Sequence, residues 1–345
     1  MNTIILTGGG TAGHITPNLA LIPALRKKYD EIHYIGSENG MEREMLKSVG
    51  GVTYHAIPCA KLNRGSIVKN FGLPFTLSDG VKRAKKLIAE INPRVIFSKG
   101  GYVGLPVSLA SGAVPLIIHE SDLTIGLANR LALRKADRFL SAFELDHPRA
   151  EWVGAPLREE IYRGNAAKTR KTLGLTEKLP VLLITGGSQG AKALNDATDG
   201  AIDELTKSFN VIHLGGKQCG GELRKPRYVR LTFSDDMAGI YAAADLAVTR
   251  GGSNTLFELA ALGIPALVVP LPKGASRGDQ IDNANYFAER GCVRVLPQAE
   301  LTPQSLVTQV NTLYSRLDTM KSNAKKIARL DGRKEIAEIL CEYAK

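Results

Sequence analysis

A short apolar segment followed at once by a glycine-rich turn and a helix occurs near the start of both halves of this chain. In the first half, residues 2–7 predict a buried strand, 8–14 a glycine loop and 17–28 a helix. In the second half, residues 179–185 predict the strand and 186–190 the glycine loop. Further strand patterns follow each of these units. The chain is therefore predicted to be an α/β protein with two doubly wound, Rossmann-like domains.

The length of the chain supports this division. At 345 residues the chain exceeds what one ordinary hydrophobic core holds. The segment Gly154-Ala155-Pro156-Leu157-Arg158 reads as a domain boundary. We therefore expect an N-terminal domain over 1–155 and a C-terminal domain over 156–331.

Composition narrows the class of protein. A hydrophobic content of 44% with 23% charged residues is typical of a globular protein. The four cysteines form no CxxC pair, which argues against a zinc site or a disulfide framework. The start MNTIILTGGG lacks the features of a signal peptide, and no apolar run approaches the ~20 residues that span a bilayer. These features predict a cytoplasmic protein.

The first glycine loop carries a weak motif. Gly8, Gly10 and Gly13 match the GxGxxG pattern of dinucleotide-binding domains. The next predicted strand ends in Gly36-Ser37 rather than in an acidic residue, so binding of NAD is not favoured. What remains is that small residues let backbone N–H groups approach a phosphate or another polar ligand.

Of the net charge of +11, a surplus of six lies in one stretch of the first half. Between Lys61 and Lys86 there are seven basic residues and one acidic residue, Asp79. Apolar residues at helical spacing from 77 to 88 predict a surface helix here, and an ordinary helix over the core explains that stripe. The preceding loop suggests a membrane-facing patch in which Phe and Leu enter lipid while basic groups meet anionic head groups. The residues of this predicted patch are Lys61, Arg64, Lys69, Phe71 and Phe75.

Residues 246–285 predict an anion site in the second half. A strand over 246–249 is followed by a Gly-Gly-Ser turn and a helix over 255–262. The free N–H groups and the dipole at such a helix N-terminus favour phosphate. Glu258, one turn into the helix, suits the hydroxyls of a ribose, although a glutamate there is also favoured by capping alone. We read the segment, with Asp279 and Gln280 on a polar loop behind it, as a site for a sugar nucleotide.

Taken together, the loops resemble those of the MurG family of peripheral glycosyltransferases, within glycosyltransferase family 28. The resemblance covers the whole chain, through GGGTAGHITPNLAL, KGGYVGLPVSLA, IHESDLTIGLANR, GAPLR, GGSQGAKALN, FSDDM and RGGSNTLFELAALGIPALVVP with GDQIDNA. It implies a GT-B fold and transfer of N-acetylglucosamine (GlcNAc) from UDP-GlcNAc to undecaprenyl-diphosphate-linked MurNAc-pentapeptide in peptidoglycan synthesis. It also implies peripheral attachment to the cytoplasmic face of the membrane, no nucleic-acid partner, no further cofactor, and a last helix, about 332–345, that returns to the first domain.

The resemblance also assigns residues to the donor. Arg158, Ser188 and the backbone near Ser234 hold the uridine and phosphates, Glu258 the ribose, and Gln280 the GlcNAc hydroxyls. The full set is Thr11, Ala12, Gly13, Asp122, Arg158, Ser188, Ser234, Gly252, Ser253, Asn254, Thr255, Glu258, Asp279 and Gln280. This chain departs from many members in having Ser121-Asp122 after His119-Glu120, Asp279 before Gln280, and Gly251-Gly252-Ser253. The polar character is kept, which indicates a subtype.

The implied reaction is one in-line displacement with inversion, which needs a base for the acceptor hydroxyl and positive potential for the diphosphate. His14 is our candidate base because its pKa range suits the task, and Glu120 or Asp122 is the competitor. The sequence has no cluster of aspartates of the kind that would indicate a metal site. Three alternatives stay open: a diacylglycerol glycosyltransferase, a UDP-GlcNAc epimerase, and a non-catalytic sensor of sugar nucleotides.

Overall fold

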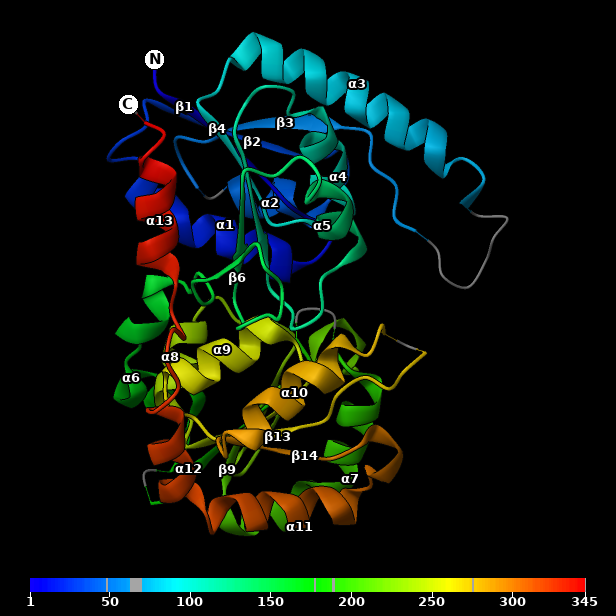
Figure 1. The fold of residues 1–345 in the computed structure, drawn as a ribbon. Helices are drawn as coiled ribbons and strands as arrows, with labels where there is room; N and C mark the ends of the chain where they lie inside the picture. The colour runs from blue at the N-terminus through cyan, green and yellow to red at the C-terminus, as the bar shows by residue number, and fades with distance from the viewer. Residues whose placement is uncertain (48, 63–69, 177, 188–189, 275, 345) are drawn as a thin grey trace. The chain divides into compact units, whose positions relative to one another are not determined.

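The computed structural model describes residues 1–47, 49–62, 70–176, 178–187, 190–274 and 276–344. Within them the chain divides into two compact units (Figure 1). Unit 1 comprises Met1–Arg158 and Asp331–Lys345, and unit 2 comprises Glu159–Leu330. The chain first passes from unit 1 to unit 2 after Arg158, three residues beyond the boundary that we expected at residue 155.

Unit 1 is built on a seven-stranded sheet of described residues, in the order β3-β2-β1-β4-β5-β6-β7 with parallel pairs throughout. Its strands are β1 (Thr3–Thr7), β2 (Glu31–Ser37), β3 (Thr53–Ile57), β4 (Val95–Ser98), β5 (Leu116–Glu120), β6 (Arg138–Ser141) and β7 (Ala150–Trp152). Its helices are α1 (Ala12–Leu25), α2 (Met41–Lys47), α3 (Leu73–Ile91), α4 (Gly101–Ala110), α5 (Leu127–Ala132) and α13 (Arg333–Cys341).

Alternation along the strands explains the layers of unit 1. Ile4 and Leu6 belong to one buried cluster, whereas Ile5 between them belongs to another. The first cluster takes side chains from α1 and α13, and the second from α3, α4 and α5. Both faces of the sheet are therefore covered, as its run of apolar residues requires.

The last helix packs beside the first. Ile336 and Leu340 of α13 are fully buried in the same cluster as Leu21 of α1, and the Tyr29 hydroxyl donates a 2.5 Å hydrogen bond to the carbonyl of Leu340. Figure 1 shows the red helix alongside the blue one. Helix α12 ends at Ala324, residues 325–332 are not helical, and α13 begins at Arg333, just after the polar pair Asp331-Gly332.

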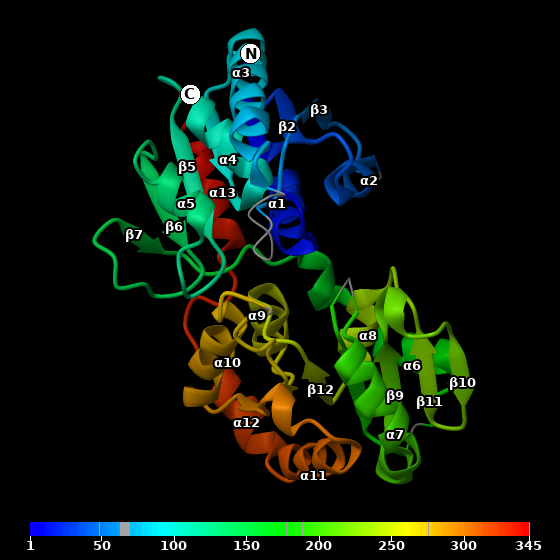
Figure 2. The ribbon, with the colours of Figure 1, turned by 90° about the vertical axis from the view of Figure 1, so that its right-hand side faces the viewer.

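Unit 2 contains a second seven-stranded sheet of described residues, in the order β10-β11-β9-β8-β12-β13-β14. Its strands are β8 (Val181–Thr185), β9 (Asn210–Leu214), β10 (Leu223–Lys225), β11 (Tyr228–Leu231), β12 (Leu246–Thr249), β13 (Ala266–Val268) and β14 (Val293–Val295). Its α-helices are α6 (Ala166–Leu173), α7 (Lys192–Ser208), α8 (Met237–Ala243), α9 (Ser253–Ala261), α10 (Asp279–Glu289), α11 (Pro303–Tyr314) and α12 (Leu317–Ala324). Among the paired strands, β10 runs antiparallel to β11 at one edge (Figure 2).

Helices cover both faces of this sheet as well. One buried cluster joins Leu182 and Val248 of the sheet to Leu194 of α7 and Leu306 of α11. On other helices, the ring of Phe257 in α9 meets that of Phe287 in α10 edge-on, with centroids 5.2 Å apart. Both sheets thus show the doubly wound α/β arrangement that the sequence predicted.

Three predicted boundaries near the candidate site are wrong. Helix α1 begins at Ala12 rather than near 17, because extended Thr11 acts as N-cap and the His14 N–H already bonds the Thr11 carbonyl at 3.0 Å. Helix α9 begins at Ser253, directly after Gly252. Asp279 opens α10, so Asp279 and Gln280 lie in a first helical turn and not on a loop.

Candidate active site

The carboxyl ends of β1, β4 and β5 lie side by side in unit 1 because these strands are parallel neighbours. The turn after β1 leads into His14 on the first turn of α1, and the turn after β4 begins with Lys99. Nδ1 of His14 lies 3.1 Å from the carbonyl oxygen of Lys99. Since that oxygen can only accept, Nδ1 carries the proton and the lone pair of the neutral ring lies on Nε2.

A glycine holds this arrangement. Gly101 has a φ of 73°, a conformation that side chains rarely adopt, and a Cβ there would lie 3.2 Å from Cδ2 of His14. The sequence singled out the His14 loop and the glycine turn after β4 separately. The structure brings His14 and that turn into contact.

The glycine loop after β1 rests on a buried carboxylate that the sequence analysis missed. Glu42 of α2 is fully buried. Its Oε1 accepts hydrogen bonds of 2.9 Å from the Ser37 N–H and 2.5 Å from the Ser37 hydroxyl, and its Oε2 accepts from Gly10 N–H at 3.4 Å. The carboxylate therefore ties the loop after β1 to the end of β2. A lone glutamate in a short helix gave no sequence signal of this role.

Glu120, the competing candidate for the base, is a buried brace. Its carboxylate accepts hydrogen bonds from four groups of the described residues, at 2.8 to 3.2 Å. The donors are the N–H groups of Ser121, Asp122 and Gly126 and the Nδ2 group of Asn129. A carboxylate with its lone pairs used in this way orders the 121–126 turn, which favours His14 as the group that receives a proton. Asp122 is half-buried on the turn that Glu120 orders.

In unit 2 the predicted anion site follows β12, a central strand. Helix α9 begins right after Gly251-Gly252, so its first N–H groups lie at the carboxyl edge of the sheet. Ser253 is buried there, and Asn254 and Thr255 are half-buried. Gly251 packs against the carbonyl of Gln280, where a Cβ would overlap that group. The turn after β12 and the start of α10 therefore meet, as a joint donor site requires.

Glu258 is held on the second turn of α9. The residue is 8% exposed, and its Oε2 accepts a 2.8 Å hydrogen bond from the hydroxyl of Tyr241 on α8. Capping does not explain this position, because the carboxylate bonds a side chain of another helix. Tyr241 was missed by the sequence analysis, since nothing in the spacing of 17 residues marks the pair.

The remaining predicted donor residues are placed as follows. Oε1 of Gln280 accepts from the Leu271 N–H at 3.0 Å, and Oδ1 of Asp279 accepts from the Arg277 N–H at 3.1 Å. Ser234 lies before α8, and its hydroxyl accepts from the Asp236 N–H at 3.2 Å. Arg158 is half-buried as the last residue of this stretch of unit 1. Ser188 lies outside the described residues.

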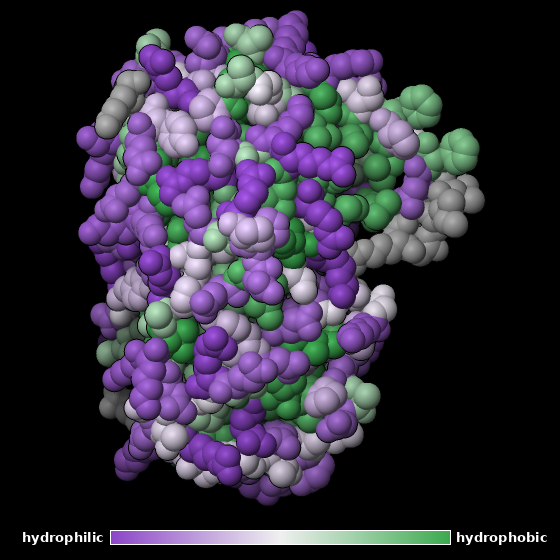
Figure 3. Space-filling view, viewed as in Figure 1, coloured by the Kyte–Doolittle hydropathy of each residue, from purple (hydrophilic) through white to green (hydrophobic). Residues whose placement is uncertain are grey.

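The predicted membrane patch is described in part. Phe71, two residues before α3, and Phe75 on its first turn are 82% and 73% exposed, and Lys61 and Leu62 are exposed as well. Hydrophobic side chains gather at this end of α3 in Figure 3. Arg64 and Lys69 lie outside the described residues. No helix in the described ranges is both long enough and apolar enough to cross a membrane.

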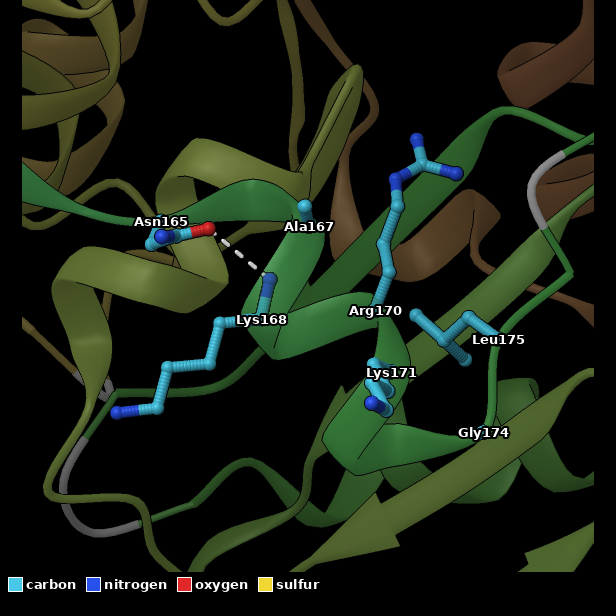
Figure 4. A pocket seen from close by; sticks show the side chains of 7 residues that line it. All are labelled: Asn165, Ala167, Lys168, Arg170, Lys171, Gly174 and Leu175. Atoms are coloured by element: carbon cyan, nitrogen blue, oxygen red, sulfur yellow. Dashed lines mark hydrogen bonds between the residues drawn. The ribbon is translucent and has the colours of Figure 1, made fainter.

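Over the part of the chain that the structure describes, no cluster of three or more His, Cys, Asp or Glu side chains suits a metal ion. An open cavity of about 590 Å³ in unit 2 is lined by Asn165, Ala167, Lys168, Arg170, Lys171, Gly174 and Leu175. Its basic side chains point away from one another (Figure 4), so they do not converge on an anion. None of the predicted site residues lines this cavity.

Two domain families match this chain, one in each half. The glycosyltransferase family 28 N-terminal domain matches residues 4–141, and the family 28 C-terminal domain matches residues 181–340. The chain is similar to a protein of Lachnospira eligens, with 39% identity and complete coverage of both chains. It is also similar to a protein of Lachnoclostridium phytofermentans, with 42% identity over 94% of this chain and 95% of the relative. Both are named UDP-N-acetylglucosamine--N-acetylmuramyl-(pentapeptide) pyrophosphoryl-undecaprenol N-acetylglucosamine transferase.

Solved structures agree on the fold. The crystal structure of Acinetobacter baumannii MurG aligns with a TM-score of 0.75 and 24% identity over 99% of each chain. The glycosyltransferase of kitacinnamycin aligns with a TM-score of 0.72 over 99% of this chain and 98% of that one. The predicted GT-B fold is thereby confirmed. With relatives matched end to end and both domain families present, the chain belongs to glycosyltransferase family 28.

Proposed function

We propose that this protein transfers GlcNAc from UDP-GlcNAc to undecaprenyl-diphosphate-linked MurNAc-pentapeptide, the activity for which its relatives are named. The observation that carries the proposal is their similarity over the full length of both chains, so that both the donor half and the acceptor half are matched. The geometry of the two units supports it, since each unit supplies a different part of the required chemistry.

Unit 2 binds the donor. The diphosphate meets the N-terminus of α9, where free N–H groups and the helix dipole stabilise negative charge. Glu258, fixed by Tyr241, accepts hydrogen bonds from the ribose hydroxyls. Gln280 and Asp279 at the start of α10 contact the GlcNAc hydroxyls, next to the turn that holds the diphosphate.

Unit 1 supplies the base. As the C4 hydroxyl oxygen of the acceptor forms its bond to the anomeric carbon, its proton moves to Nε2 of His14, and the bond from that carbon to UDP breaks. The electron pair of that bond leaves with the UDP oxygen, and because the hydroxyl attacks from the opposite face, the anomeric centre is inverted. The Lys99 carbonyl that accepts from Nδ1–H stabilises the imidazolium that forms.

We also infer that the protein works as a peripheral protein on the cytoplasmic face of the cell membrane. Exposed Phe71 and Phe75 enter the interface, where burying a phenylalanine contributes about 1.5–3 kcal/mol. Lys61 and the basic side chains of α3 add attraction to anionic lipid, on the order of 1 kcal/mol each. The lipid-linked acceptor is then found in the same layer.

The deciding experiment measures UDP release from UDP-GlcNAc with and without a short-chain lipid-diphosphate MurNAc-pentapeptide. Release that depends on the acceptor is the expected result. Consumption of the donor without acceptor would point to an epimerase or a hydrolase. Turnover with diacylglycerol in place of the diphosphate lipid would identify a different transferase, and binding without any turnover would indicate a sensor.

A further inference from the structure

Lys99 places an ammonium group inside unit 1, beneath the candidate active site. The residue is 1% exposed. Its Nζ donates a hydrogen bond to Nδ1 of His119 and another, of 2.8 Å, to Oγ of Ser121. A buried lysine is rare unless the surrounding structure uses it, because removing the charge from water is costly.

The partner histidine is fixed as an acceptor. Nε2 of His119 lies 3.0 Å from the carbonyl oxygen of Gly154, so that nitrogen carries the proton and Nδ1 presents its lone pair to Lys99. Burial, and then the nearby Lys99 charge, hold the pKa of His119 well below its usual range. The ring is therefore neutral at physiological pH and suited to receive the lysine N–H.

The backbone of the same lysine reaches the candidate base. Its carbonyl oxygen accepts from Nδ1–H of His14 at 3.1 Å. One residue thus connects His14 on α1 to the end of β5, where His119 and Ser121 lie. The 121–126 turn beyond is held by Glu120, so Lys99 connects His14, the end of β5 and that turn.

The charges that face Lys99 come from the end of β5. The carboxylates of Glu120 and Asp122 favour the protonated ammonium, and His119 is neutral. From α1, His14 contacts the backbone carbonyl of Lys99. Burial outweighs the two carboxylates and lowers the pKa of Lys99 from its ordinary value to about 7. Hydrogen bonds from the charged ammonium to His119 and Ser121 are stronger than those from the neutral amine. Their strength therefore changes with pH near neutrality.

We propose that Lys99 is a positioning residue: its buried ammonium fastens the end of β5 to the turn that orients His14, and so keeps the base and the 121–126 turn in register. The kinetic part of this proposal rests on the proposed function. The structural part does not, since it concerns hydrogen bonds within unit 1.

The first test is Lys99→Met, which keeps the length of the side chain and removes the ammonium. We expect kcat to fall by about 10- to 100-fold, the scale that a small displacement of a catalytic group can produce, with KM for UDP-GlcNAc unchanged. Lys135→Met is the matched control, because Lys135 is an exposed lysine of the same unit that donates to the Leu109 carbonyl at 2.7 Å. A kcat within twofold of wild type, or an equal change in kcat and in donor KM, overturns the proposal.

The second test does not depend on activity. With ¹³Cε-labelled lysine, one resonance of the wild-type protein should titrate with a midpoint of about 7 and be missing from Lys99→Met. With ¹⁵N-labelled histidine, the Nδ1 resonance of His119 should shift in Lys99→Met while its Nε2 stays protonated. If wild-type protein shows no acceptor-dependent UDP release, the proposed function fails while these spectra still decide the role of Lys99. If no lysine titrates near neutrality and the His119 resonances do not move, the role of Lys99 is refuted.

Ser121→Ala is the second variant, in case Lys99→Met does not fold. It removes one acceptor of the ammonium with little change in volume, at a site assigned to neither substrate nor catalysis. The same change in kcat with unchanged donor KM, smaller in size, is expected. Wild-type kinetics together with an unshifted lysine titration contradict the proposal.

Discussion

The hydroxyl of Tyr241 donates a 2.8 Å hydrogen bond to Oε2 of Glu258, and both residues are buried in unit 2. If Glu258 receives the ribose hydroxyls, Glu258→Gln should raise the Kd of UDP by about 10- to 100-fold, because hydrogen bonds to a charged acceptor are lost. Isothermal titration calorimetry measures this directly. Tyr241→Phe, which keeps the carboxylate of Glu258, is the control and should raise the Kd of UDP by only a few-fold. Wild-type affinity in Glu258→Gln would leave the glutamate a purely structural role.

The role of His14 predicts a separation between binding and turnover. His14→Ala should lower kcat by about 10²- to 10⁴-fold, the usual contribution of a general base, and leave the Kd of UDP-GlcNAc unchanged. Single-turnover UDP release and calorimetry supply the two quantities. Asp122→Asn is the comparison. A larger loss of kcat in Asp122→Asn than in His14→Ala would show that Asp122, and not His14, is the base.

The exposed aromatic residues at the start of α3 predict membrane attachment. Phe71→Ser with Phe75→Ser should lower the partition coefficient onto anionic vesicles by 100-fold or more, since each ring contributes about 1.5–3 kcal/mol. Co-sedimentation with vesicles of phosphatidylglycerol measures the change. The control is Tyr314→Ser on α11, an aromatic residue that is 42% exposed in unit 2. Unchanged partition in the double variant would remove the patch from the proposal.

His213 predicts a loss of stability in acid. Its Nε2 contacts Oδ1 of Asn195 at 2.9 Å and its Nδ1 contacts the Tyr228 hydroxyl at 2.8 Å. Burial lowers its pKa to about 4, whereas the unfolded chain binds the proton near 6.5. Stability from this group is thus complete above 6.5 and is lost as the pH falls through 4, at up to about 1.4 kcal/mol per pH unit.

Hydrogen exchange at the amides of β9 and β11 reports on this loss within unit 2. Between pH 6 and 4, the free energy of opening should fall more steeply in wild type than in His213→Gln, which keeps donor and acceptor groups but does not titrate. Parallel pH dependences in the two proteins would show that His213 does not control this region.

Much of the fold was predictable because its strands are short apolar runs with glycine after them. The strand at 246–249 and the glycine turn beyond it were placed correctly for that reason. The short strands β10 and β14 were missed, since they read Leu-Arg-Lys and Val-Arg-Val and so contain no apolar run. The start of α1 was misplaced because Gly13 lowers helix propensity and the cap at Thr11 is set by its extended backbone.

The supports of the site were not predictable in the same way. Glu42 and Gly10 are 32 residues apart, and Lys99 and His119 are 20 apart. Each pair meets only because parallel strands bring their carboxyl ends together, which no local pattern reveals. The family resemblance supplied the donor residues, and the family is confirmed. Their individual contacts remain predictions.

Helix α13 has a consequence for how the protein is made. Its buried Ile336, Ile339 and Leu340 complete the core of unit 1, although the ribosome adds them only after the whole of unit 2. All of unit 2 is synthesised between the two parts of that core. Nascent domains ordinarily fold in the order in which they emerge. Here the order is different: the core of unit 1 is incomplete until unit 2 has been made, and a ribosome stalled before Arg333 leaves the surface of α1 that α13 covers without its partner.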